Sequence, residues 1–285
     1  MKLPSIDLSH YNPVPPGLLE SAWSLVAPAQ FESAKPHGTE WYANPRISWG
    51  TQPRADVYLP DGPGPHPSVL LCHGGAFVVG SRNMKPMRFL ATRLAAAGYA
   101  AVPFDYRLLL RGGMLQEMID DVDAVHRWWL RQKDVYNLDL DRVAMAGLSA
   151  GAALALLHAS MPPLPPLSHV VCFFGIYHFG QIEGPSGSWV PRLLLDTSDR
   201  QVWAERSPFG NCGTPFPLLL LHGGLDRLTP VEQAYDVVAE RRNRGLETSL
   251  KIFESAPHAF LNDLRRPEAE EGVTALLEFL STSKV

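Results

Sequence analysis

A serine lies between two glycines in the pentapeptide Gly147-Leu148-Ser149-Ala150-Gly151. The apolar run before it, 142–146, predicts a short buried strand, and the Ala- and Leu-rich run after it, 150–159, predicts a helix. Gly-x-Ser-x-Gly at such a junction is typical of a nucleophile elbow, which holds the serine oxygen at the sheet edge and the positive end of a helix. Glycines also flank serines in ordinary turns, so it is the predicted strand and helix that favour a nucleophilic Ser149.

A serine nucleophile needs a base and an acid that orients the base, and in this arrangement they follow in the order Ser, Asp or Glu, His. Asp226 ends a Gly-containing loop after the apolar run 216–221, and His258 lies in the loop after the alternating run 249–254. Loops at the carboxyl ends of parallel strands share one rim of the sheet, so we expect both residues to meet Ser149. The alternative without a catalytic role is that Asp226 caps a turn and His258 is an incidental surface residue.

Two adjacent glycines follow a third apolar run, 68–72, in the segment His73-Gly74-Gly75-Ala76-Phe77. Paired glycines let the backbone pass close to a substrate, where backbone N–H groups can stabilise a developing negative oxygen. A loop of this kind accompanies the elbow in lipases and esterases. We expect His73 to hold the loop in place, with no part in the chemistry.

These segments resemble the α/β-hydrolase superfamily, especially the hormone-sensitive-lipase-like carboxylesterases and the group containing feruloyl esterases and kynurenine formamidase. The resemblance covers about residues 50–280 and also rests on Phe-Asp-Tyr-Arg-Leu at 104–108. The chain departs from it at three positions. Ala76 stands where the lipase-like group usually has a third glycine, Leu148 where that group usually has an acidic residue, and Phe77 where the formamidase-like group usually has tryptophan.

The resemblance implies an α/β-hydrolase fold and a serine esterase that cleaves small-molecule carboxylic esters without a cofactor. It implies that the N–H groups of Gly75, Ala76 and Ala150 form the oxyanion hole. One alternative is an arylformamidase or amidase that uses the same residues. Another is a non-catalytic ligand-binding protein, as occurs among hormone receptors that resemble these esterases; such proteins usually lose a triad residue, and this chain has all three.

Predicted strands and helices alternate along the chain, which indicates a mostly parallel sheet with helices on both faces. For example, apolar residues at helical spacing predict a helix over 116–131. Residues 46–49 and 55–59 predict an antiparallel opening pair of strands. We divide the chain into an N-terminal arm, 1–43, and a catalytic domain, 44–285.

The arm is rich in proline, carries the aromatic anchors Tyr11, Trp23 and Trp41, and contains one helix-like patch, 17–26. It either covers the site or only wraps the surface. Residues 180–207 break the alternation and predict a small lid above Ser149. Phe77, Trp189 and Leu194 are the expected walls of an apolar pocket, which favours short or small aromatic acyl groups.

Composition bounds the remaining possibilities. The 285 residues are 46% hydrophobic with a net charge of −4 and a pI near 6.2, which favours one large domain and gives no sign of a nucleic-acid partner. Neither a secretory signal nor a membrane-length apolar stretch is evident, and the cysteines are three, so we expect a cytoplasmic protein. The histidines lack zinc-type spacing, so no metal is expected. The oligomeric state stays open, a homodimer included.

Overall fold

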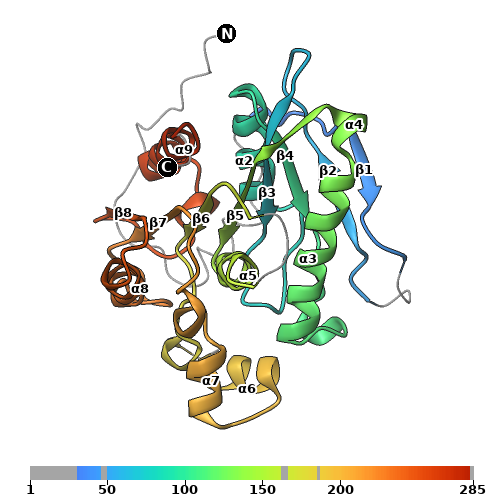
Figure 1. Ribbon diagram of the computed structural model, residues 1–285. Helices are drawn as coiled ribbons and strands as arrows, with labels where there is room; N and C mark the ends of the chain where they lie inside the picture. The colour runs from blue at the N-terminus through green and yellow to red at the C-terminus, as the bar shows by residue number, and fades with distance from the viewer. Residues whose placement is uncertain (1–30, 46–49, 162–165, 185–186, 283–285) are drawn as a thin grey trace.

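A single eight-stranded sheet organises the computed structural model, which describes residues 31–45, 50–161, 166–184 and 187–282 (Figure 1). The strands lie in the order β1-β2-β4-β3-β5-β6-β7-β8. Their bounds are β1 Gly38–Trp41, β2 Arg54–Val57, β3 His66–Cys72, β4 Ala100–Phe104, β5 Leu138–Leu148, β6 Val170–Phe173, β7 Leu218–Gly223 and β8 Thr248–Phe253. The strands from β3 to β8 run parallel, whereas β1 and β2 are antiparallel, which confirms the mostly parallel sheet.

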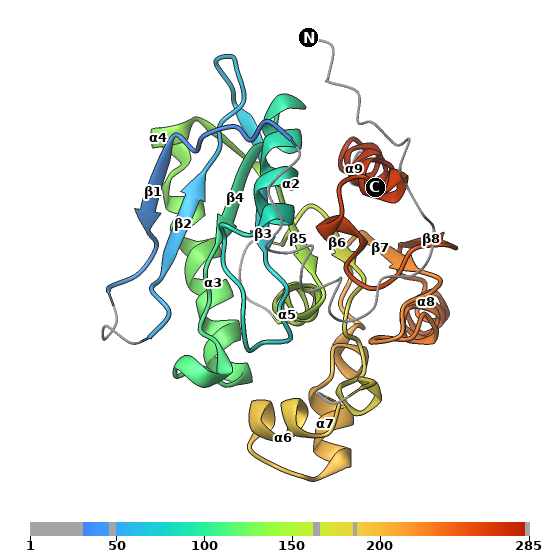
Figure 2. The same ribbon diagram turned by 180° about the vertical axis from the view of Figure 1, so that it is seen from behind.

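Helices cover both faces of this sheet, as Figures 1 and 2 show from opposite sides. Their bounds are α2 Lys85–Ala96, α3 Leu115–Arg131, α4 Lys133–Tyr136, α5 Ala150–Ala159, α6 Trp189–Leu195, α7 Arg200–Arg206, α8 Glu232–Asn243 and α9 Pro267–Leu280. Side chains alternate along a strand, so β3 sends Leu70 into a core with α3, α5 and α8, and Leu71 into a second core with α2 and α9. Each fully buried leucine stabilises the fold by about 1.5–3 kcal/mol.

The first strand pair differs from the expected one. β2 pairs with Gly38–Trp41, which lies inside the range predicted as an arm, and the predicted strand 46–49 lies outside the described residues. The patch 17–26 and the anchors Tyr11 and Trp23 also lie outside them. The three cysteines are free and buried.

The segment between β6 and β7 projects beyond the carboxyl edge of the sheet and contains α6 and α7 (Figure 1). Its two ends are tied together, because the Phe179 N–H donates to the Ser207 hydroxyl at 2.8 Å and the Phe209 N–H donates to the Tyr177 carbonyl at 3.0 Å. Gln233 of α8 is fully buried and accepts hydrogen bonds from the N–H groups of Tyr177 and His178, both at 2.9 Å. The base of this segment is therefore fixed to the body of the protein.

A pair of buried histidines joins α3 to α5. His126 Nδ1 lies 3.0 Å from His158 Nε2, and both side chains are almost fully buried. Burial and the neighbouring His158 lower the pKa of His126 to about 3, and burial lowers the pKa of His158 to about 4. Both rings are therefore neutral in the folded protein near neutral pH.

This pair makes stability depend on pH. Histidines in the unfolded chain titrate near pH ~6.5, so below that pH the unfolded chain binds protons that the folded chain does not. The contribution of the two histidines to the free energy of unfolding is complete above that pH. It is lost as pH falls toward the pKa values of the folded protein, by up to about 1.4 kcal/mol per pH unit for each histidine. We expect a His158→Gln variant to lose less stability than the unsubstituted protein between pH 7 and 5. Urea unfolding at both pH values checks this, and equal losses in the two proteins would contradict it.

Candidate active site

Ser149 sits in the tight turn between β5 and α5. Its backbone has φ 52° and ψ −115°, a strained conformation for a residue with a side chain. The flanking glycines permit the turn: a Cβ on Gly147 would lie 2.3 Å from the Gly151 carbonyl oxygen, and a Cβ on Gly151 would lie 2.2 Å from the Cys72 carbonyl oxygen. Both contacts are too short for any side chain, so the predicted elbow requires glycine at these two positions.

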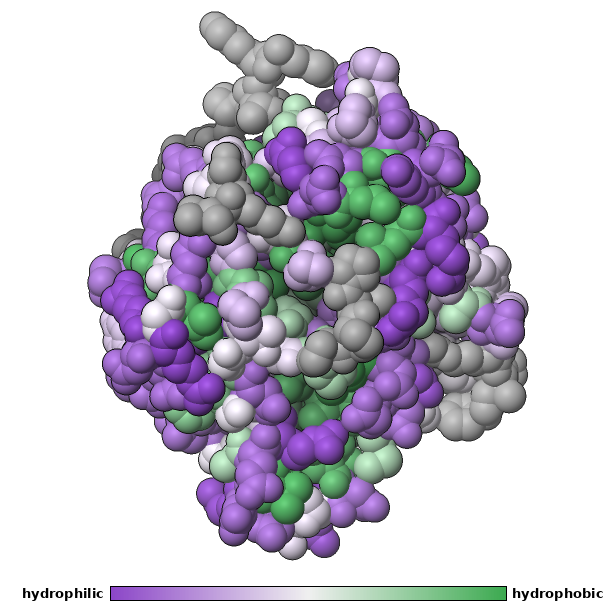
Figure 3. Space-filling model, in the orientation of Figure 1, coloured by the Kyte–Doolittle hydropathy of each residue, from purple (hydrophilic) through white to green (hydrophobic). Residues whose placement is uncertain are grey.

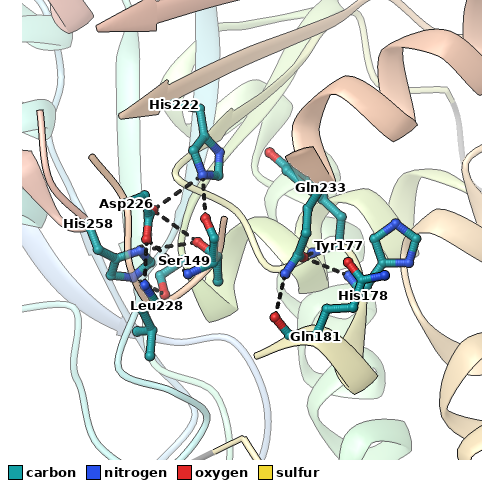
Figure 4. A network of polar contacts seen from close by, with 10 residues as sticks. Ser149, Tyr177, His178, Gln181, His222, Asp226, Leu228, Gln233 and His258 are labelled. Carbon is teal, nitrogen blue, oxygen red and sulfur yellow. Dashed lines mark hydrogen bonds and ion pairs between the residues drawn. The ribbon is translucent and has the colours of Figure 1, made fainter. Parts of the chain in front are cut away.

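The three side chains predicted to meet do so at the carboxyl ends of β5, β7 and β8 (Figure 4). Ser149 Oγ lies 2.9 Å from His258 Nε2, and His258 Nδ1 lies 2.7 Å from Asp226 Oδ2. Ser149 is 6% exposed and the Asp226 side chain is fully buried, whereas the His258 side chain is 16% exposed. A hydroxyl, an imidazole and a carboxylate are thus connected in sequence, with the imidazole at the solvent side.

Asp226 uses both carboxylate oxygens. Oδ1 accepts hydrogen bonds from the N–H groups of Leu228 and Thr229, each at 2.9 Å, so the residue does cap its own turn. Oδ2 faces His258, the Thr229 hydroxyl at 3.0 Å and His222 Nε2 at 3.2 Å. Burial alone would raise the pKa of this carboxyl, but the charge of His258 and the hydrogen bonds from His222 and His258 outweigh burial and hold the pKa well below its ordinary value. The carboxylate is therefore ionised wherever the protein is folded near neutral pH.

Thr229 and His222 are contacts of Asp226 that the sequence analysis does not assign to the site. An Asp followed by Thr three residues later is a signal for a turn closed by the Asp side chain, and this turn brings the Thr229 hydroxyl onto Oδ2. His222 carries no such local signal, because its contact depends on how the loop 223–229 folds back over the end of β7.

The glycine loop after β3 passes directly beside Ser149. A Cβ on Gly74 would lie 3.3 Å from Ser149 Cβ, and the next residues, Gly75 and Ala76, both have positive φ. Neither of their N–H groups donates to a backbone carbonyl within the part of the chain that the structure describes. Ala150 begins α5, so its N–H is among the first-turn donors that have no partner within the helix. Three N–H groups of this loop and of the start of α5 thus have no backbone acceptor among the described residues.

Polar contacts hold both ends of this loop. The Tyr106 hydroxyl donates to the His73 carbonyl at 2.9 Å, and the two rings stack with centroids 4.2 Å apart, which agrees with a holding role for His73. At the far end, the Arg82 N–H donates to Asp105 Oδ1 at 2.8 Å while its guanidinium pairs with Asp105 and, at 3.0 Å, with Asp56. The loop is therefore held at both ends by contacts within the protein.

The residues expected to line a pocket lie in different surroundings. Phe77 is fully buried and contacts Phe179 edge to face, with centroids 6.1 Å apart, while Leu194 is buried in the same core. Trp189, the first residue of α6, is 40% exposed. The end of the molecule that carries α6 and α7 shows hydrophobic patches among hydrophilic surface (Figure 3). Phe174 packs against His258 with centroids 5.2 Å apart, an aromatic contact that the sequence analysis does not identify.

Within the described ranges, no three His, Cys, Asp or Glu side chains gather as metal ligands would. Across the same ranges, no helix combines the length and apolar character needed to cross a membrane.

Comparison with known proteins finds similarity to esterases. It is 32% identical to the esterase LipC of Mycobacterium tuberculosis over 199 residues, which cover 62% of this chain and 49% of LipC. It is 27% identical to the probable carboxylic ester hydrolase LipM of the same organism, covering 63% of this chain and 46% of LipM. The chain therefore spans about half the length of these relatives.

The fold also matches a solved structure, the apo form of Thermogutta terrifontis esterase 2, with a TM-score of 0.74 at 20% identity over 87% of this chain and 95% of that chain. A family model, BD-FAE, matches residues 55–240, a span that includes Ser149 and Asp226 and ends before His258. On this match, the chain belongs to the BD-FAE family of α/β-hydrolases.

Proposed function

We propose that this protein is a serine hydrolase that cleaves carboxylic esters through Ser149, His258 and Asp226. The observation that carries the proposal is the continuous contact from Ser149 Oγ to His258 Nε2 and from His258 Nδ1 to Asp226, at 2.9 and 2.7 Å. The names of the two mycobacterial relatives, an esterase and a probable carboxylic ester hydrolase, support the same activity.

In this mechanism Ser149 Oγ attacks the acyl carbonyl carbon while His258 Nε2 accepts the hydroxyl proton. The alkoxide leaving group departs with that proton, and water then repeats the sequence to release the acid. Asp226 accepts a hydrogen bond from the Nδ1–H of His258 throughout. This bond keeps Nε2 free to take the proton and stabilises the imidazolium cation that forms.

The negative oxygen of the tetrahedral intermediate would be bound by the N–H groups of Gly75, Ala76 and Ala150. Such donors are effective because they are already oriented when the charge develops, and the loss of one typically costs about 100- to 1,000-fold in kcat. The positive φ of Ala76, 53°, is the strain that this arrangement requires of a residue other than glycine.

We expect a preference for soluble esters of short or small aromatic acids. The base of the segment that carries α6 and α7 is anchored by Ser207 and Gln233, so its position does not await a lipid interface. Buried Phe77 and Leu194, with Trp189, would bound an acyl pocket of limited depth. Hydrolysis rates on nitrophenyl esters of increasing acyl length, and on emulsified triglyceride, measure this preference; faster turnover of the emulsion would contradict it.

N-formylkynurenine belongs in the same series. Faster hydrolysis of this formamide than of short esters would assign the Ser149 site to the arylformamidase alternative. Absence of turnover and of fluorophosphonate labelling would leave the non-catalytic alternative. Labelling of Ser149 together with ester turnover is the result that supports the proposal.

A further inference from the structure

A second histidine lies against the carboxylate of Asp226 (Figure 4). His222 is the penultimate residue of β7 and its side chain is fully buried. Its Nε2 lies 2.8 Å from the carbonyl oxygen of Thr229 and 3.2 Å from Asp226 Oδ2. One ring nitrogen therefore faces both the oxygen that holds His258 and the residue that ends the Asp226 turn.

The surroundings of the His222 ring define where its hydrogen sits. Both neighbours of Nε2 are acceptors, since one is a carbonyl oxygen and the other a carboxylate, so Nε2 must carry a hydrogen. His222 Nδ1 is buried and contacts no hydrogen-bond partner among the residues that the structure describes. A hydrogen on Nδ1 alone would leave a buried N–H donor unpaired, which is unfavourable. It would also bring the lone pairs of His222 Nε2, the Thr229 carbonyl and Asp226 Oδ2 against one another. The geometry thus selects the Nε2–H form as the donor to Asp226.

We propose that His222 is a positioning residue for the Ser149 site, whose Nε2–H bridges Asp226 Oδ2 and the Thr229 carbonyl. The inference rests on the proposed hydrolase function and adds a residue to it. His222 makes no contact with Ser149 or His258 among the contacts that the described residues form, so it acts on them through Asp226 and Thr229.

The bridge matters because Oδ2 is the oxygen on which the orientation of His258 depends. Two backbone N–H groups hold Oδ1, but in the described part of the chain Oδ2 is held by side chains alone: His258, the Thr229 hydroxyl and His222. The Thr229 hydroxyl also lies 3.2 Å from His258 Nδ1. The position of this hydroxyl therefore decides whether it competes with the contact between His258 Nδ1 and Asp226 Oδ2. By fixing the Thr229 carbonyl and Oδ2 together, His222 keeps the loop 223–229 in the form that presents Oδ2 to His258. The low pKa of Asp226, to which the His222 hydrogen bond contributes, agrees with this role.

The test compares His222→Leu with His222→Gln. Leucine has similar volume and no donor, whereas the glutamine amide nitrogen reaches about as far from the backbone as Nε2 and restores the donor. We expect His222→Leu to lower kcat by about 10- to 100-fold with KM within about twofold, because the lost contact orients the catalytic groups and does not bind substrate. We expect His222→Gln to regain most of that loss. His66→Leu, which removes a buried histidine at the opposite end of the sheet, is the matched control and should keep the unsubstituted rate.

Two results would overturn the proposal: a folded His222→Leu variant with unchanged kcat, or a His222→Gln variant as slow as His222→Leu. Nitrogen NMR of histidine-labelled, unsubstituted protein tests it without any variant that has to fold. The His222 signals should report a hydrogen on Nε2 and none on Nδ1, and the reverse pattern would exclude the bridge. These outcomes are separate from failure of the proposed function, which would appear as absent ester turnover and absent Ser149 labelling in the unsubstituted protein.

Discussion

Replacing Ser149 by alanine is expected to lower kcat by about 10,000-fold or more, because the nucleophile of the proposed mechanism disappears while the oxyanion donors remain. The fold should be unaffected: alanine fits the same elbow and keeps the backbone N–H bond to the Phe173 carbonyl, and the Ser149 hydroxyl contacts a side chain, His258, and no backbone group among the described residues. The measurement is steady-state turnover of a soluble nitrophenyl ester, with circular dichroism and thermal unfolding to confirm that the variant is folded.

Ser160→Ala is the matched control, since Ser160 ends the same helix, α5, and its hydroxyl donates to the Leu156 carbonyl. It should retain near-normal turnover and fluorophosphonate labelling, whereas Ser149→Ala should lose both. A folded Ser149→Ala variant that still turns over at a rate close to that of the unsubstituted protein would remove the serine mechanism altogether.

Local sequence patterns predict the elements around Ser149 because each has a strong periodicity or a steric requirement. The apolar stripe over 116–131 corresponds to α3, Leu115–Arg131, and the glycines at 147 and 151 mark contacts that exclude any side chain. Once the strands are parallel, their carboxyl ends share one rim, so loops far apart in sequence come together. That is why Asp226 and His258 could be placed beside Ser149 from their positions after strands.

What the sequence does not predict depends on partners that are distant or on loops that fold back. β1, Gly38–Trp41, has no apolar alternation, and it becomes a strand because β2 offers it an edge to pair with. The segment from Thr229 to Glu232 has the pattern of a helix cap, yet α8 begins at Glu232 and the Thr229 hydroxyl turns to Asp226. His222 likewise has no local sequence pattern that predicts its contact with Asp226. In each case a tertiary contact outweighs a local preference.

Replacing Asp226 by asparagine is expected to lower kcat by about 1,000- to 10,000-fold, somewhat less than loss of Ser149. The reason lies in the two sides of the carboxylate. The N–H groups of Leu228 and Thr229 both point at Oδ1, so the asparagine carbonyl oxygen will take that place and turn its NH2 group toward His258.

An NH2 group in the position of Oδ2 is a hydrogen-bond donor, and it would face a second donor, the Nδ1–H of His258. His258 must then carry its hydrogen on Nε2, the atom 2.9 Å from Ser149 Oγ, and that atom can no longer accept the serine proton. The variant should fold but lose some stability, because the Thr229 hydroxyl and His222 Nε2 also lose their acceptor. Turnover of Asp226→Asn is compared with that of Asp263→Asn, an aspartate on the loop after His258 whose carboxylate pairs with Arg265. Near-normal turnover of Asp226→Asn, together with a large loss in Asp263→Asn, would transfer the role of the acid to Asp263.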